Sequence, residues 1–190
     1  LCINDPGSTR GHLLVLADGM GGAEAGEVAS RIAVETLAEV YLSGRDGPAA
    51  SLRRGVAEAN ARIYFASQER PETHGMGTTC TALVALVERV FVAQVGDSRA
   101  YRVRAGTIDR LTDDHSLWAE HVRSEGQRFS PQITSGRNQL TRAVGTDPQV
   151  EPAITETDLK PGDQLLLCSD GLWGLVTDPE ILWVVTAGTP

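Results

Sequence analysis

Residues 13–22 read Leu-Leu-Val-Leu-Ala-Asp-Gly-Met-Gly-Gly, a continuous apolar run followed by a glycine-rich turn. The run from Leu13 to Ala17 predicts a buried strand that ends at Asp18. The glycines predict a turn, and an amphipathic helix is expected from about Ala23. Its expected apolar stripe comprises Val28, Ile32, Leu37 and Val40. This stretch therefore predicts strand, turn and helix in succession, with a carboxylate where the strand ends.

The rest of the chain continues with helix and then changes to strand. Pro48 is expected in the first turn of a second helix, where its ring is tolerated. Later runs predict strands at Thr78–Val87, Val90–Val95, Arg99–Arg104 and Gln164–Cys168. Ser116 is expected to cap a short helix, Asp178 to begin a last helix, and Gly126 to Asn138 to form an exposed loop or flap. Because helix and strand do not alternate regularly, the order predicts an α+β fold, mostly antiparallel sheet with helices outside.

Length and composition narrow the class of protein. The chain has 190 residues, so we expect one domain spanning 1–190 with a sizeable core. Seventeen Lys plus Arg against 25 Asp plus Glu give a net charge of -8, which disfavours a nucleic-acid partner. No apolar stretch is long enough for a membrane segment. The three cysteines lack metal-ligand spacing and are expected to be reduced thiols of a cytoplasmic protein.

Three apolar runs share one feature, an aspartate beside a glycine at the end of the strand. These aspartates are Asp18, Asp97 and Asp170. Strand ends at one edge of a sheet lie close together, so the three carboxylates are expected to converge and to repel one another unless a cation is present. Mg²⁺ and Mn²⁺ prefer carboxylate, carbonyl and water oxygens as ligands. The pattern therefore predicts a divalent metal site.

Other interpretations of these residues stay open at this point. Each aspartate alone is typical of a capped Asp-Gly turn. The strand, glycine turn and helix also resemble the start of a dinucleotide-binding fold, but Glu24 replaces its third glycine and Asp18 would repel a pyrophosphate. A zinc site is disfavoured because the histidines lack paired spacing. They are His12, His74, His115 and His121, of which His115 is expected to have a structural hydrogen-bonding role.

Six motifs, in order, resemble those of the bacterial metal-dependent Ser/Thr protein phosphatase family (PPM, type 2C). They are Asp18-Gly19-Met20-Gly21-Gly22 with Gly26-Glu27, Gly75-Met76-Gly77-Thr78-Thr79, Val95-Gly96-Asp97-Ser98-Arg99, Leu111-Thr112 with Asp114-His115-Ser116, Leu140-Thr141-Arg142-Ala143-Val144-Gly145, and Ser169-Asp170-Gly171-Leu172-Trp173. The resemblance covers essentially the whole chain. It implies a central antiparallel β-sandwich flanked on both faces by antiparallel helix pairs, a four-layer α-β-β-α arrangement.

The resemblance also implies a site and an activity. Asp18 would bridge two Mn²⁺ or Mg²⁺ ions, the Gly19 carbonyl would bind one of them, and Asp170 would hold the second. Asp97, with Asp170, would hold a third, weaker ion. The nucleophile would be a metal-bound water that attacks phosphoserine or phosphothreonine, so no side chain serves as nucleophile. The expected partners are phosphoprotein substrates of bacterial Ser/Thr kinases. The protein is expected to be a monomer, with no nucleic-acid or membrane partner.

Three departures from the family pattern qualify this expectation. Eukaryotic members carry a histidine where this chain has Met20, and a thioether cannot transfer a proton. A phosphate-contacting arginine and an Asn-Glu-Asp motif would precede Leu1, and a C-terminal Asp-Asn motif would follow Pro190. The chain is therefore expected to lack both ends of the catalytic domain. The alternative is a catalytically impaired phosphoprotein-binding or regulatory module of the same fold.

Overall fold

The computed structural model describes residues 1–3, 10–125 and 139–187, so the flap expected between Gly126 and Asn138 lies outside the described residues. The strands are β1 (Cys2–Ile3), β2 (His12–Leu16), β3 (Gly19–Met20), β4 (Gly77–Thr78), β5 (Cys80–Ala85), β6 (Arg89–Val95), β7 (Arg99–Arg104), β8 (Thr107–Arg110), β9 (Ala153–Asp158) and β10 (Gln164–Cys168). The helices are α1 (Ala23–Ser43), α2 (Pro48–Glu69), α3 (Leu117–Glu125), α4 (Asp170–Trp173) and α5 (Asp178–Ala187), with a 3-10 turn, η1 (Pro71–Thr73). None of these helices is both long and apolar enough to cross a membrane.

Two antiparallel sheets form the centre of the fold. Five strands pair in the order β1-β2-β5-β6-β9, and three pair in the order β10-β7-β8. One face of the larger sheet packs on the smaller one through a cluster that includes Leu83, Val92 and Ala100, with Leu165 and Leu167 against it. The short pair β3-β4 stands outside both sheets. The predicted α+β class with a central antiparallel β-sandwich is confirmed.

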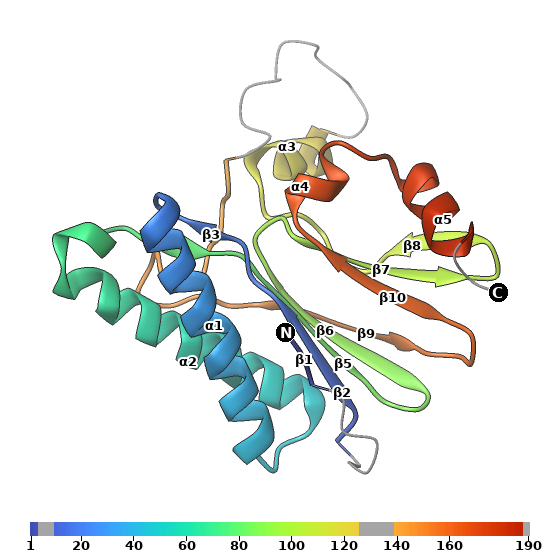
Figure 1. Ribbon diagram of the computed structural model, residues 1–190, viewed down its shortest axis with the longest axis horizontal. Helices are drawn as coiled ribbons and strands as arrows, with labels where there is room; N and C mark the ends of the chain where they lie inside the picture. The colour runs from blue at the N-terminus through green and yellow to red at the C-terminus, as the bar shows by residue number, and fades with distance from the viewer. Residues whose placement is uncertain (4–9, 126–138, 188–190) are drawn as a thin grey trace.

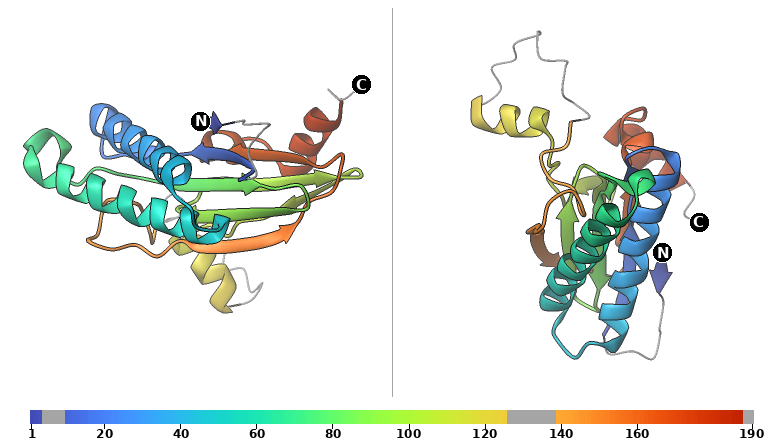
Figure 2. Two further views of the ribbon diagram at one scale, coloured as in Figure 1. Left: turned by 90° about the horizontal axis from the view of Figure 1, so that it is seen from below. Right: turned by 90° about the vertical axis from the view of Figure 1, so that its left-hand side faces the viewer.

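Helices α1 and α2 cover the other face of the five-stranded sheet, as Figure 1 and Figure 2 show. Of the apolar stripe predicted for α1, Leu37 is buried, and Val28 and Ile32 pack against the core although they are only half-buried. The fully buried positions also include the small residues Ala29 and Ala33, which were not predicted. Alanines occupy these positions because α1 packs against α2 and the sheet at once, and short side chains allow both approaches.

The second sheet is covered differently from the first. Its neighbours in the described residues are the one-turn α4 and helix α5, which contacts β8. The hydroxyl of Tyr101 on β7 donates a 3.0 Å hydrogen bond to Asp178, which begins α5. Within the described part of the chain, the helix pair expected on this face is thus represented by α5 and the short α4. The first face carries the complete pair.

Besides the two-residue strands β1 and β3, two longer strands, β8 and β9, were not predicted from the sequence. Both are edge strands, and their outer residues are polar and at least partly exposed. Edge strands carry charged side chains that prevent pairing with other chains, so they lack the apolar run on which strand prediction depends. Strand β9 closes the larger sheet by pairing with β6 along its length, from Gln94↔Ala153 to Arg89↔Asp158.

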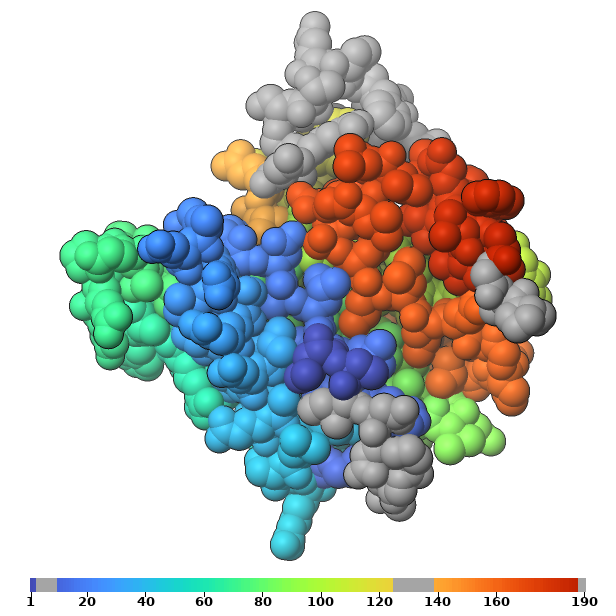
Figure 3. Space-filling view, in the orientation of Figure 1, coloured from blue at the N-terminus to red at the C-terminus, as the bar shows by residue number. Residues whose placement is uncertain are grey.

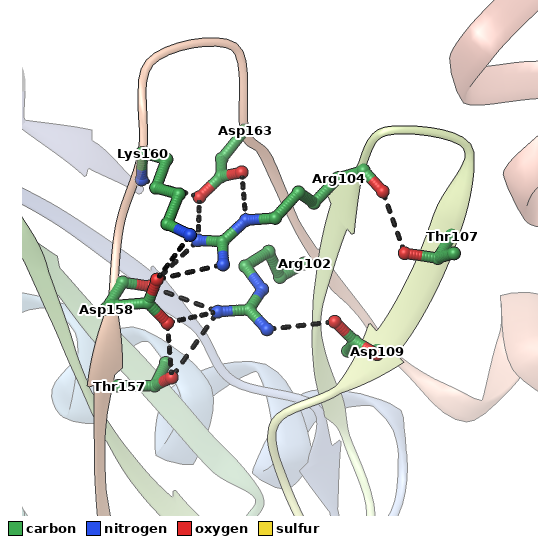
Figure 4. Close-up of polar contacts among 8 residues, drawn as sticks. All are labelled: Arg102, Arg104, Thr107, Asp109, Thr157, Asp158, Lys160 and Asp163. Carbon is green, nitrogen blue, oxygen red and sulfur yellow. Dashed lines mark hydrogen bonds and ion pairs between the residues drawn. The ribbon is translucent and has the colours of Figure 1, made fainter.

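An ion-pair cluster joins the two sheets where β7, β8 and β9 meet (Figure 4). Arg104 donates two hydrogen bonds to Asp163, of 2.7 and 2.6 Å, and one of 2.9 Å to Asp158. Arg102 donates to Asp158 and to Asp109 on β8. The side chain of Asp163 is only 1% exposed. The Arg104 guanidinium holds the pKa of this carboxyl at about 2, so Asp163 remains charged.

We expect Asp163→Asn to destabilise the protein by about 1–3 kcal/mol, because Arg104 loses its most buried, charge-assisted partner. The matched control is Glu156→Gln, which removes the exposed partner of Arg89 and should cost less than about 0.5 kcal/mol. Denaturant unfolding of both variants measures the difference. Equal losses would show that the cluster does not hold the sheets together.

Candidate metal centre

The three predicted aspartates lie at one end of the sandwich. Asp18 follows β2, Asp97 lies in the turn between β6 and β7, and Asp170 follows β10 as the first residue of α4. Strand β3 and helix α4 lie at the same end of the molecule (Figure 1). The blue N-terminal surface and the orange-red surface around α4 border one another in Figure 3. The fold thus brings together strand ends that are far apart in the sequence.

The three carboxylates influence one another electrostatically. Burial raises the pKa of Asp18, and the charge of Asp170 and a hydrogen bond with it raise that pKa further. Burial also raises the pKa of Asp97, to about 6, with contributions from the charges of Asp170, Asp114 and Asp18. Among the described residues, no Lys or Arg forms a salt bridge with any of these three aspartates. Their mutual repulsion is the kind that a bound cation relieves.

The same residues do not enclose an ion by themselves. In the described part of the chain, no three His, Cys, Asp or Glu side chains group tightly enough to hold a metal. Mg²⁺ and Mn²⁺ often retain several waters and take backbone carbonyls as ligands, so a site with few carboxylates suits them. The backbone of the exposed Gly19 lies beside Asp18. The donor set therefore fits a hydrated, hard divalent cation and does not fit zinc.

A hydrogen-bonded chain fixes Asp18 relative to Asp97. The backbone N–H of Asp18 donates to Thr79 Oγ1 at 2.9 Å, and the N–H of Thr79 donates to the Asp18 carbonyl at 2.9 Å. The Thr79 hydroxyl also lies 2.8 Å from that of Ser98, the residue after Asp97. Thr79 and Ser98 are both buried. Thr79, between β4 and β5, thus connects two of the three carboxylate positions.

The turn that carries Asp97 is held from beneath by buried polar side chains. Gln94 Nε2 donates to the carbonyls of Gly96 and Ser98, and Thr81 donates to Gln94 Oε1. Gly96 has φ +97°, and a Cβ there would lie 2.7 Å from Thr79 Cγ2, so only glycine fits. Thr81 and Gln94 were not predicted as part of the site. The available signal was a pair of polar residues inside otherwise apolar strands.

His115 has the structural role that was expected. Its Nδ1 accepts a 3.2 Å hydrogen bond from the Gly96 N–H, and the backbone N–H of His115 donates to the Gly96 carbonyl at 2.9 Å. Burial lowers the pKa of His115 to about 4, with further lowering by the charges of Arg142 and Arg123 against opposing effects of Glu120 and Asp113. The imidazole is therefore neutral near pH 7 and accepts the hydrogen bond that shapes the turn.

Arg99 holds α4 against the second sheet. Its guanidinium makes two hydrogen bonds to Asp114, of 3.0 and 2.7 Å, and lies 3.6 Å from the ring centroid of Trp173. Because α4 runs from Asp170 to Trp173, this stacking fixes the helix that presents Asp170.

Ser116 caps α3, as predicted, through a 3.3 Å hydrogen bond from the Ala119 N–H to its hydroxyl.

Gly19 and Gly26 approach more closely than any side chain would permit. A Cβ on Gly26 would lie 2.8 Å from the carbonyl carbon and oxygen of Gly19. We expect Gly26→Ala to cost about 1–2 kcal/mol, because the backbone clash exceeds the gain in helix propensity. Gly55→Ala in α2 is the matched control, since its nearest neighbour is the Leu37 side chain, at 3.1 Å. Thermal unfolding should show a loss for Gly26→Ala and little change for the control.

Protonation of His115 should destabilise the fold. Its folded-state pKa lies below the ordinary value of 6.5, so the unfolded chain binds the proton more readily as pH falls from 6.5 toward 4. Between pH 7 and pH 5 the protein should lose about 2 kcal/mol more stability than His115→Asn, which retains an acceptor but does not titrate. Denaturant unfolding with a chelator present measures this difference. If the unfolding free energies of the unmodified protein and of His115→Asn fall equally between pH 7 and pH 5, His115 is not the group responsible.

The family profile for protein phosphatase 2C matches residues 7–187. The chain is 35% identical over 175 residues to the serine/threonine phosphatase stp of Listeria welshimeri serovar 6b, covering 89% of this chain and 69% of that protein. The Mycobacterium tuberculosis phosphatase PstP/Ppp has a similar structure, with TM-score 0.82 and 36% identity over 93% of this chain and 75% of the other. A PstP catalytic domain in complex with two manganese ions gives TM-score 0.80 and 36% identity, over 94% of this chain and 74% of the other. The chain belongs to the protein phosphatase 2C family of metal-dependent Ser/Thr phosphatases, whose cofactors are Mn²⁺ or Mg²⁺.

Proposed function

We propose that this protein hydrolyses phosphoserine and phosphothreonine in other proteins, using Mn²⁺ or Mg²⁺ held by Asp18, the Gly19 carbonyl, Asp97 and Asp170. The observation that carries the proposal is the convergence of three carboxylates from separate strand ends without a salt-bridging Lys or Arg among the described residues. Family membership supports the same assignment. An uncompensated anionic cluster binds cations and would repel a phosphate unless cations were present.

The residues of this chain position the reactants. Asp18 and Asp170 would share ions, a role supported by their positions at strand ends and by their direct interaction. Thr79 fixes Asp18 through both of its backbone polar groups, and Arg99 fixes the helix of Asp170. When bound, the divalent cations activate water as the nucleophile and stabilise negative charge on the phosphoryl oxygens. Precise placement of these carboxylates determines where an attacking water would meet the phosphorus.

Protonation of the leaving alkoxide is assigned to water. Met20 has no proton to donate, although it lies on β3 directly after Gly19. His115 is buried and neutral, and its Nδ1 already accepts the Gly96 N–H. A serine or threonine alkoxide is a poor leaving group and needs an acid. Solvent water beside the exposed end of β3 meets this need without a dedicated side chain.

Covalent cysteine chemistry does not suit this chain. Burial raises the pKa of Cys80 to about 12 and that of Cys168 to about 11. Thiols with such pKa values are not thiolates at neutral pH and are weak nucleophiles. Buried, unpaired thiols also favour the cytoplasm as the working compartment. We infer that the protein acts in the cytoplasm, as a monomer, on proteins phosphorylated by bacterial Ser/Thr kinases.

The test is hydrolysis of an aryl phosphate and a phosphothreonine peptide by the intact protein. We expect activity only with Mn²⁺ or Mg²⁺, and a loss of at least about 100-fold in kcat for Asp18→Asn and Asp170→Asn. Asp97→Ala should retain tight metal binding and lower kcat more than it raises KM, as expected for a weaker third ion. Asp46→Asn, in the exposed turn between α1 and α2, is the control and should remain active. Full activity after exhaustive chelation would contradict the proposal, and metal binding without hydrolysis would indicate a regulatory module.

A further inference from the structure

A cleft of about 290 Å³ lies between the end of β8 and helix α3, beside the candidate metal centre. Its lining residues are Arg99, Arg110, Asp113, Asp114, Trp118, Ala119, Val122 and Arg123. Three arginines around one cleft stand out in a chain with a net charge of -8. The volume is close to the lower limit of ligand pockets, about 300 Å³, which suits a side chain better than a larger molecule.

The cleft and the metal centre share one wall. This wall is the segment that joins β8 to α3, with Asp114 on the cleft side. At its next residue, His115, the backbone and ring bind both polar groups of Gly96, directly before Asp97. The charge of Asp114 also influences Asp97. A substrate whose phosphorylated residue reaches the aspartates would therefore bring its flanking residues to this cleft.

Not all charged side chains of the cleft are fully paired with other described residues. Arg99 and Asp114 neutralise each other through two short hydrogen bonds. Arg110, whose side chain is 37% exposed, approaches Asp113 and Asp114 only at 3.8 and 3.6 Å, beyond normal hydrogen-bond length. Arg123, on helix α3, donates one hydrogen bond of 3.1 Å, to the Asp114 carbonyl. Within the described residues, these two guanidinium groups thus retain donors for an oxyanion.

The remaining walls indicate which oxyanion fits. Trp118, Ala119 and Val122 provide an apolar surface for the aliphatic stem of a side chain. Asp113, 71% exposed, places one negative charge beside the cleft. That charge opposes a doubly charged phosphate more strongly than a singly charged carboxylate. Arg pairs also match the planar carboxylate through parallel hydrogen bonds.

We propose that Arg110 and Arg123 bind the carboxylate of a glutamate or aspartate that flanks the phosphorylated residue in a protein substrate. This inference rests on the proposed phosphatase function and specifies its substrate class. Acidic flanking residues would raise the affinity and on-rate of a substrate for an otherwise acidic protein. The contribution is electrostatic and partly exposed, so it weakens as salt is added.

The test uses the intact protein loaded with Mn²⁺ and phosphothreonine peptides in which glutamate is moved through the flanking positions. Each peptide has a partner with glutamine at the same position. We expect glutamate to raise kcat/KM by about five- to tenfold over glutamine at one or two neighbouring positions, as a charge-assisted contact would. Arg110→Gln and Arg123→Gln should each reduce this ratio toward one. Arg53→Gln, an exposed arginine on α2 that pairs with Glu151, should retain it.

Hydrolysis of an aryl phosphate, which has no flanking residue, should be equal in all four proteins and confirms that the variants fold. The inference is overturned if glutamate and glutamine peptides react equally at every position. It is also overturned if both arginine variants keep the full ratio, or if a second phosphothreonine is preferred over glutamate at the same position. Absence of aryl phosphate hydrolysis by the unmodified protein with Mn²⁺ would instead refute the proposed function.

Discussion

The site depends on holding three like-charged carboxylates at one end of the sandwich. Asp18, Asp97 and Asp170 end or follow strands from both sheets, and burial, with a further contribution from their mutual repulsion, raises the pKa values of the first two. Such a cluster opens unless the surrounding structure holds it or a cation compensates it. Much of the polar structure at this end of the sandwich can be understood as a response to this electrostatic cost.

The side chains that fix the positions of the aspartates are short, buried and mostly neutral. Thr79 and Ser98 connect the positions of Asp18 and Asp97 by hydroxyl groups, and Gln94 supports the turn between them. Neutral donors fix the backbone without cancelling the negative charge that a metal needs. Arg99 is bound to Asp114 and stacked on Trp173, so it orders α4 without forming a salt bridge to the three aspartates. Positioning and charge are thus assigned to different residues.

Arginine charge is used differently elsewhere in the molecule. In the cluster of Figure 4, Arg102 and Arg104 donate short hydrogen bonds to Asp109, Asp158 and Asp163 and join the sheets, although Arg102 Nε has no partner among the described residues. At the cleft beside α3, Arg110 and Arg123 are only partly satisfied. The same side-chain type therefore stabilises the fold in one place and remains available for an external anion in another. Short hydrogen bonds to carboxylates, present in the Figure 4 cluster and absent at Arg110 among the described residues, distinguish the two environments.

The sequence by itself determined the strand that ends at Asp18, both long helices, the central strands, the cap at Ser116 and the three aspartates, because these features depend on local periodicity and turn chemistry. It missed the two-residue strands β1 and β3 and the longer strands β8 and β9, of which the last two have the composition of an exposed edge. It also left Ala29 and Ala33 out of the buried stripe of α1, since the packing partner of a helix selects which of its residues are most buried. Only the tertiary structure decided that Thr79 contacts Ser98, that His115 supports Gly96 and that Arg110 and Arg123 line one cleft. These contacts join residues on separate elements, and no local pattern encodes a distance between two strands that meet only when the sandwich closes.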